Sequence, residues 1–251
     1  MPTSAPEPAP ERSGRGSTRT AVVWAGLEPV LARGGGARDV LDIGGGTGGF
    51  AVRVGALGHR VTVVDPSPDA LAALDRRARE HDVAVTGRQG DLSSLLDVVA
   101  PGSADVVLCH GVLEVVDDPA DALQAVAAAL RPRGLLSLLV TQRHAAVLAK
   151  ALAGHLADAR HLLVDPDGRW GDADPVPRRF TEREVTDLLT TEGFEITDAH
   201  GVRVFTDLVP STLVDTEPGA AEALYALETE VADRPEFRAV AHQLHVLATL
   251  R

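Results

Sequence analysis

The stretch VLDIGGGTGGF, Val40 to Phe50, decides the fold class of this chain. A short β-branched run ends at Asp42 and Ile43, a cluster of glycines follows, and residues 49–57 continue with a helical pattern. This order predicts a strand, a tight turn and a helix. The glycines fit two kinds of cofactor site: Gly44-x-Gly46-x-x-Gly49 has dinucleotide spacing, and Asp42-x-Gly44-x-Gly46-x-Gly48 has the spacing of an S-adenosylmethionine (SAM) site.

Strand and helix patterns alternate on both sides of this turn. The expected strands are 59–65, 83–91, 104–113 and 134–142, and the expected helices are 18–33, 67–80 and 119–132. Ser67 or Asp69 lies near the start of the second of these helices. Continuous apolar strands that alternate with helices predict a parallel sheet covered on both faces.

The C-terminal third departs from this rhythm. Here we expect helices at 145–159, 181–193 and 220–232, strands at 194–205 and 242–250, and a Pro/Gly/Asp-rich loop at 165–179. Two late strands joined by a helical segment predict a sheet edge closed by an antiparallel strand. The fold class is therefore α/β, a Rossmann-like doubly wound sheet. We expect a disordered tail at 1–16 and one domain at 17–251, with a lid-like insertion around 143–180.

Composition limits the classes of function. A formal net charge of −12 disfavours a nucleic-acid partner, because the molecule as a whole repels polyphosphate. A single Cys109 cannot form an internal disulfide, no apolar run is long enough to cross a bilayer, and the N-terminus lacks the pattern of a signal peptide. The prediction is a soluble protein of the cytoplasm with no membrane partner.

Three carboxylates distinguish the two cofactors. Asp65 ends the second strand, where a carboxylate accepts hydrogen bonds from ribose hydroxyls in both kinds of site. Asp42 lies just before the glycine turn, where it opposes a pyrophosphate but favours the ammonium group of SAM. Asp91 ends the third strand and suits the adenine amine, although it equally suits the N-cap of a helix over LSSLL. Together these residues favour SAM.

The segments VLDIGGGTGG, VTVVD, QGDL, CHGVLEVVDDP and LRPRGLLSLLV follow one another in the order and spacing of a known family. Over residues 38–142 the chain resembles the class I SAM-dependent methyltransferases. The resemblance implies a seven-stranded sheet, mostly parallel, with an antiparallel last strand. Arg133 departs from the family, which commonly has glycine in the turn before the fifth strand.

Segments outside this core resemble one branch, the bacterial tRNA 5-carboxymethoxyuridine methyltransferases (SmtA-like proteins). They are TRTAVVW, CHGVLE, HGVRVFTD, ALYALETE and LHVLAT. The resemblance implies that Arg19 binds the methionyl carboxylate of SAM, and that the cofactor also contacts Gly44, Gly45, Asp65, Gln89, Gly90 and His110. It further implies methyl transfer to a carboxylate oxygen. That reaction needs positioning and electrostatics rather than a general base, because a carboxylate is already ionised near neutral pH.

The acceptor is the open part of this interpretation. Arg203 is the first candidate for pairing with a substrate carboxylate, and Arg143 and His144 follow the fifth strand, although each also suits a structural contact. Acids between Asp167 and Asp174 disfavour a tRNA backbone. A small-molecule O- or N-methyltransferase is therefore the alternative, and an NAD-dependent oxidoreductase or a non-catalytic SAM-binding protein represents another class.

We expect no metal site. His242 and His245 lie three residues apart on an expected strand, so their side chains point to opposite faces and make a poor pair of metal ligands.

Overall fold

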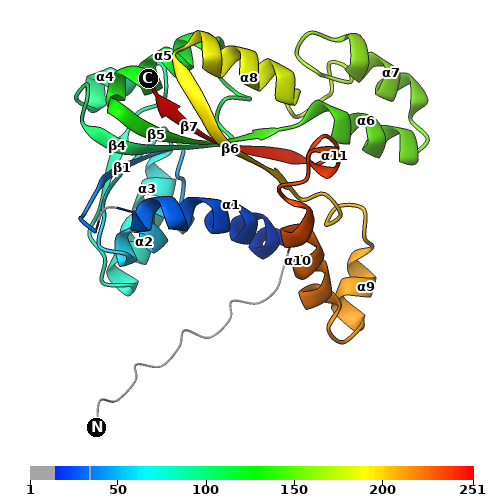
Figure 1. Ribbon diagram of the computed structural model, residues 1–251, viewed down its shortest axis with the longest axis horizontal. Coiled ribbons are helices and arrows are strands. Elements are labelled where there is room, and N and C mark those ends of the chain that lie inside the picture. Colours follow the sequence, from blue (N-terminus) through cyan, green and yellow to red (C-terminus); the bar gives the residue numbers. More distant parts are fainter. Residues whose placement is uncertain (1–14, 34) are drawn as a thin grey trace.

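The protein folds around one seven-stranded sheet with strand order β3-β2-β1-β4-β5-β7-β6 (Figure 1). The computed structural model describes residues 15–33 and 35–251, and the side chains from Thr20 onward, again without residue 34. The strands are β1 (Asp39–Ile43), β2 (Arg60–Asp65), β3 (Val85–Gln89), β4 (Ala104–His110), β5 (Leu130–Thr141), β6 (Phe194–Val202) and β7 (Gln243–Leu250). Only β7 runs antiparallel to its neighbours β5 and β6, as the family resemblance implies.

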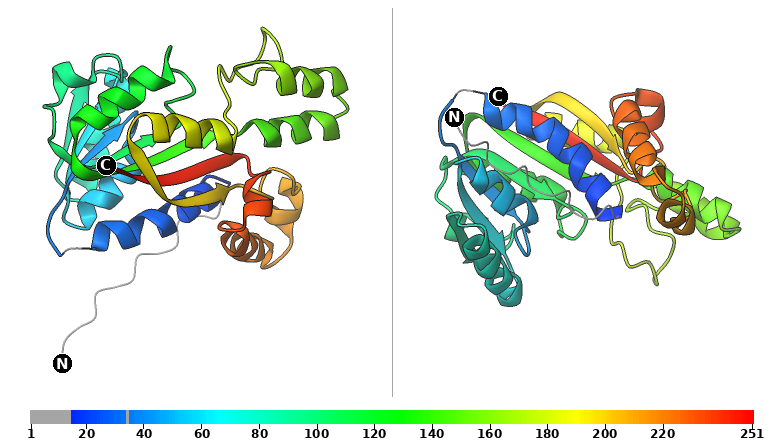
Figure 2. Two further views of the ribbon diagram at one scale, coloured as in Figure 1. Left: turned by 45° about the horizontal axis from the view of Figure 1, so that its top comes forward. Right: turned by 90° about the horizontal axis from the view of Figure 1, so that it is seen from below.

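Helices cover both faces of the sheet (Figures 1 and 2). One face carries α1 (Arg15–Ala32), α2 (Gly49–Ala56) and α3 (Pro68–Glu80), and the other carries α4 (Leu95–Val98), α5 (Pro119–Ala129) and α8 (Glu182–Thr191). The pair α6 (Arg143–Leu152) and α7 (Leu156–Val164) extends beyond the end of the sheet, and α9 (Ser211–Thr216), α10 (Ala220–Val231) and α11 (Pro235–Arg238) lie in the connection from β6 to β7.

Strand alternation sets up two apolar cores. In β1, Leu41 and Ile43 face α5, whereas Val40 packs with Leu27 and Leu31 of α1. Asp42 alternates with Leu41 and Ile43, so its side chain lies on the same face as Val40, beneath the glycine turn. The register of a buried strand therefore places the carboxylate before the turn at the carboxyl end of the parallel strands.

Several boundaries differ from the sequence expectations. The antiparallel last strand is confirmed, and the structure adds its position: β7 lies between β5 and β6, so β6 is the outermost strand and pairs antiparallel with β7. The helix expected at 145–159 is two helices, because Gly154 adopts φ +80° and ends the first one. The helix α1 begins at Arg15, two residues before the predicted domain start, and most of the predicted 1–16 tail lies outside the described residues.

None of the helices in the described part of the chain combines the length and the apolar content needed to cross a membrane.

Candidate functional site

The glycines of the turn between β1 and α2 are required for different structural reasons: positive φ, close packing or an open side of the turn. Gly44, Gly46 and Gly48 have φ of +67°, +54° and +79°, a backbone region that L-residues rarely adopt. A Cβ on Gly48 would lie 2.2 Å from Leu74 Cδ1, and one on Gly44 would lie 2.6 Å from Val112 Cγ2. A Cβ on Gly46 would meet no atom closer than 3.9 Å, so this glycine lines the open side of the turn.

Asp65 ties the glycine turn to the end of β2. Its carboxylate accepts a hydrogen bond from Gly46 N at 2.9 Å and another from Ser67 N at 2.9 Å. Each carboxylate oxygen keeps a second lone pair, so the group can accept further hydrogen bonds from a diol. The side chain is buried at the carboxyl end of the parallel strands, the edge at which α/β sheets bind ligands.

Asp42 carries a buried carboxyl group near the glycine turn, with no cation beside it in the described part of the chain. It is 3% exposed, and no cation is among the groups that shift its pKa. Burial, and then the nearby Asp65, raise the pKa of Asp42 to about 7. A Cβ on Gly45 would lie 2.5 Å from Asp42 Oδ2, which explains the glycine at that position. A bound ammonium group would relieve the cost of ionising Asp42.

The third strand ends in the expected polar segment. The side-chain amide of Gln89 donates to Pro66 O at 3.4 Å, and Gly90 N donates to Asp65 O at 3.3 Å, so this segment lies against the end of β2. Asp91 is exposed and accepts hydrogen bonds from Ser93 Oγ at 2.7 Å and from Ser94 N at 3.1 Å. These hydrogen bonds lower the pKa of Asp91. Asp91 thus makes the side-chain-to-backbone hydrogen bond that the alternative interpretation predicts, although the residue directly before α4 is Ser94.

His110 ends β4 on the same sheet face as Asp42. Its ring meets Phe50 edge-on, with ring centroids 5.1 Å apart, and its Nε2 lies 2.9 Å from Ser137 Oγ. The backbone of Arg19 belongs to α1, but its side chain lies outside the described residues. The predicted contact of Arg19 with the methionyl carboxylate therefore stays a prediction.

Two of the three acceptor candidates make structural contacts. Arg143 is buried, donates to Pro166 O at 2.8 Å and pairs with Glu184 at 3.1 Å, so it fastens the 165–179 loop to α8. His144 contacts Ala239 O at 3.2 Å through Nδ1.

Arg203 has a different environment, at the end of β6. Its Nη2 donates to Asp207, and the other carboxylate oxygen of Asp207 lies 3.2 Å from His242 Nδ1. Among the described residues its buried Nε has no hydrogen-bond partner, so one N–H group of the guanidinium is unpaired there. The backbone of Arg203 has φ +61°, an unfavourable conformation for a residue with a Cβ.

The segment 143–180 is held together by internal ion pairs. Arg179 and Asp174 form a buried bidentate pair, with N···O distances of 2.6 and 3.0 Å. Burial opposes ionisation of Asp174, but hydrogen bonds from Arg179 and two backbone N–H groups outweigh it and lower its pKa. Arg178 pairs with Asp167 at 3.0 Å and also donates to Val116 O at 2.9 Å. The acids that the sequence set against a tRNA backbone are thus largely neutralised within the segment.

Glu114 was not singled out from the sequence, although it lies in the quoted segment CHGVLE. Its Oε1 accepts hydrogen bonds from Thr141 N at 2.7 Å and from Thr141 Oγ1 at 2.9 Å. This buried carboxylate joins the loop after β4 to the end of β5, at the edge where the cofactor residues gather. The only sequence signal was an acid four residues after the end of an apolar strand.

The described residues give little support to a cysteine nucleophile or a metal site. Burial raises the pKa of the Cys109 thiol to about 12, so it is a poor nucleophile. The described residues include no group of three or more His, Cys, Asp or Glu side chains placed to hold a metal ion.

Comparison with known proteins agrees with this geometry. Residues 41–136 match the family model described as a methyltransferase domain. The chain is 30% identical over 240 residues to the tRNA 5-carboxymethoxyuridine methyltransferase of Escherichia coli (strain K12), covering 93% of this chain and 88% of that protein. It is 32% identical over 184 residues to the ubiquinone biosynthesis O-methyltransferase of Xanthomonas axonopodis pv. citri, covering 73% and 71%. The crystal structure of a SAM-dependent methyltransferase from Mesorhizobium loti superposes with TM-score 0.58 at 21% identity, covering 92% of this chain and 99% of that one.

Proposed function

The chain belongs to the SAM-dependent methyltransferases, and from that premise we propose that it transfers the methyl group of SAM to a carboxylate oxygen, with tRNA 5-carboxymethoxyuridine as the first candidate acceptor. The observation that carries the choice of acceptor is the match to the E. coli enzyme over 93% of the chain. That match extends well past the methyltransferase domain of residues 41–136 into the C-terminal third.

The residues around the glycine turn suit SAM. Its sulfonium supplies an already activated methyl group. Asp65 would accept the ribose hydroxyls with the lone pairs that Gly46 N and Ser67 N leave free. Asp42 would pair with the methionyl ammonium, a cation that the buried carboxylate otherwise lacks. Asp91 and Gly90, at the end of β3, would take the adenine edge.

Arg203 is the residue that we propose for holding the acceptor carboxylate. A guanidinium binds a carboxylate through two parallel N–H donors, and Arg203 has a buried Nε that Asp207 does not occupy. The chain also keeps arginine at φ +61°, where glycine or asparagine would cost less, which supports a role for its side chain. Methyl transfer to an ionised carboxylate needs alignment and no base, so no catalytic base is proposed.

A small-molecule carboxylate or hydroxyl is the second candidate acceptor. The similarity to the Xanthomonas O-methyltransferase supports it, as does the net charge of −12. Incubation with radiolabelled SAM and separate pools of tRNA and of small metabolites distinguishes the two. Label in tRNA that mild alkali releases, as expected for a methyl ester, supports the first proposal. Label only in small molecules would contradict it.

The cofactor assignment is tested by calorimetry with S-adenosylhomocysteine (SAH). Asp65→Ala is expected to weaken SAH binding about tenfold or more, because charged hydrogen bonds to the ribose are lost. Asp75→Asn is the matched control, since Asp75 is an exposed carboxylate on α3 that pairs with Arg79. Unchanged affinity in Asp65→Ala would contradict the assignment.

The acceptor assignment is tested by Arg203→Gln and Arg203→Lys. The glutamine variant is expected to raise the KM for the acceptor by about tenfold or more while SAH affinity stays unchanged, and the lysine variant to recover part of the loss. Arg183→Gln is the control, because Arg183 lies exposed beside Asp187 on α8. Equal effects of the two glutamine variants would contradict a role for Arg203.

A further inference from the structure

A row of buried and partly buried polar side chains crosses four strands on the α1 face of the sheet. It consists of His110 on β4, Ser137 on β5, His245 on β7 and His200 on β6. Ser137 and His245 are both 0% exposed. Strand register places His245 directly opposite His200, and their rings stack with centroids 5.3 Å apart.

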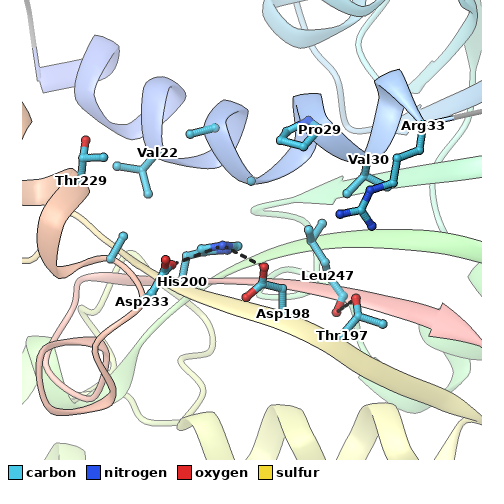
Figure 3. Close-up of a pocket in the computed structure, with 13 residues that line it drawn as sticks. Val22, Pro29, Val30, Arg33, Thr197, Asp198, His200, Thr229, Asp233 and Leu247 are labelled. Carbon is cyan, nitrogen blue, oxygen red and sulfur yellow. Dashed lines mark hydrogen bonds and ion pairs between the residues drawn. The ribbon is translucent and has the colours of Figure 1, made fainter.

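The outer end of the row lies at a cavity of about 390 Å³ between α1 and β6, shown in Figure 3. There His200 Nε2 lies 3.5 Å from Asp198 and 3.5 Å from Asp233. His200 stacks on His245 without a hydrogen bond to it among the described contacts. Among the described contacts, the hydrogen bonds within the row join His110 to Ser137 and Ser137 to His245.

Ser137 lies at equal distances from the two histidine rings. Ser137 Oγ lies 2.9 Å from His110 Nε2 and 2.9 Å from His245 Nε2. A serine hydroxyl donates one hydrogen bond and accepts others, so the two imidazoles cannot both be acceptors toward it. The proton positions on the two rings are therefore coupled through Ser137.

The surroundings of His245 determine the direction of this coupling. Burial, and then the neighbouring His110 and His200, lower the pKa of His245 well below its ordinary value, so its ring is neutral with one N–H. The Nδ1 of His245 is buried and has no hydrogen-bond partner in the described part of the chain. A proton on Nδ1 would be an orphaned buried donor, whereas a proton on Nε2 is donated to Ser137 Oγ. The described contacts offer the buried Ser137 hydroxyl no acceptor besides these two rings, so Ser137 donates its own proton to His110 Nε2.

We propose that Ser137 and His245 are positioning residues that hold His110 in one neutral tautomer, with its proton on Nδ1. The carboxyl end of β4 then presents a single defined N–H donor instead of a mixture of donor and acceptor. A neutral donor also avoids the repulsion that an imidazolium would exert on a sulfonium. This last step rests on the proposed cofactor site, but the tautomer assignment does not.

The tautomers are measured on the cofactor-free protein with ¹⁵N-labelled histidine, from long-range ¹H–¹⁵N spectra at pH 7.5. Signals are assigned by their loss in His110→Gln and His245→Gln. We expect His110 with its proton on Nδ1 and His245 with its proton on Nε2. A wild-type His110 with its proton on Nε2 would overturn the proposal.

Variants test the coupling. Ser137→Ala and His245→Phe are expected to abolish the single tautomer of His110 and to weaken SAH binding about threefold to tenfold, whereas Ser137→Thr, which keeps the hydroxyl, retains both properties. The matched control His200→Gln removes the stacked ring but no member of the hydrogen-bonded chain, so it leaves the His110 spectrum unchanged. An unchanged His110 tautomer in folded Ser137→Ala would also overturn the proposal. Wild-type tautomers as expected, together with no SAH binding, would support the proposal and contradict the cofactor site instead.

Discussion

Asp42 is a buried carboxylate whose pKa is raised by burial and by the nearby Asp65. Its pKa of about 7 without cofactor means that it is only partly ionised at neutral pH, and a bound ammonium favours the ionised form. The affinity for SAH is therefore expected to rise about tenfold from pH 6 to pH 8, because ionisation of Asp42 no longer has to accompany binding. Calorimetry across this range measures the change.

The control for this pH dependence is Asp91. Hydrogen bonds from Ser93 and Ser94 lower its pKa, so it stays ionised from pH 6 to pH 8. Asp91→Asn is expected to weaken SAH binding yet keep the pH slope, whereas Asp42→Asn removes the slope. A slope that survives in Asp42→Asn would contradict the assignment.

The raised pKa of Asp42 also affects the stability of the cofactor-free fold. A carboxyl whose folded pKa lies above its unfolded value is favourable at low pH, and its contribution is lost as the pH rises toward 7. Asp42→Asn is thus expected to increase the free energy of unfolding by about 2 kcal/mol at pH 8 and to have little effect near pH 4. Urea titrations at the two pH values check the sign.

Arg133 carries a conformational cost that the sequence already indicated. The family commonly has glycine in this turn, and the structure gives Arg133 φ +63° with an exposed side chain. Arg133→Gly is expected to stabilise the protein by about 1 kcal/mol, because a left-handed backbone strains any residue with a Cβ. Arg76→Gly, in the interior of α3, is expected to destabilise it by a similar amount. Thermal unfolding of both variants tests the opposite signs.

At the scale of elements, the sequence predicted the parts that depend on local pattern. Apolar runs separated by turn-forming glycines predicted β1, the glycine turn and β2. Ser67 caps α3, as expected for a hydroxyl at the start of a helix. It could not predict that β7 lies inside the sheet, because pairing between distant strands leaves no local signature. The end of β6 at Val202 was also missed, since the conformation of Arg203 that ends it is unusual for arginine.

In the candidate site, too, the sequence predicted the features with a local pattern and missed those that depend on contacts between distant residues. Asp42 and Asp65 were predicted from strand ends and lie together at the glycine turn. The structural contacts of Arg143 and the chain from His110 through Ser137 to His245 join residues far apart in sequence, so no spacing rule revealed them.

The loop at 165–179 behaves as an element in its own right. Arg178 connects it both to Asp167 within the loop and to Val116 in the connection after β4. Arg178→Gln is expected to accelerate amide hydrogen exchange in the loop and to raise the KM for the acceptor severalfold, with SAH affinity unchanged, because the tether to the site is lost. Arg183→Gln serves again as the exposed control. Exchange that stays slow in Arg178→Gln would show that Asp174 and Arg179 alone order the loop.

At the scale of the whole molecule, charge decides how a tRNA could be held. The net charge is −12, and the cations around the candidate acceptor site are paired within the protein: Arg143 with Glu184, Lys150 with Asp158, and Arg178 and Arg179 with loop carboxylates. These four cations therefore contribute little to the neutralisation of phosphates. If tRNA is the acceptor, recognition has to rest on the modified base and its carboxylate more than on the backbone.

This distribution of charge predicts a weak salt dependence of tRNA binding. With about two phosphates neutralised, raising the salt from about 50 to 200 mM is expected to weaken binding about tenfold, whereas proteins with six to ten phosphate contacts lose about a thousandfold or more. Filter binding with tRNA that carries the 5-carboxymethoxy group, compared with the same tRNA lacking it, measures the slope and the contribution of the carboxylate. A thousandfold loss would contradict the internal pairing of these cations, because paired arginines release few counterions. A weak slope with equal affinity for the two tRNAs would instead argue that Arg203 does not bind the carboxylate, and would favour the small-molecule acceptor.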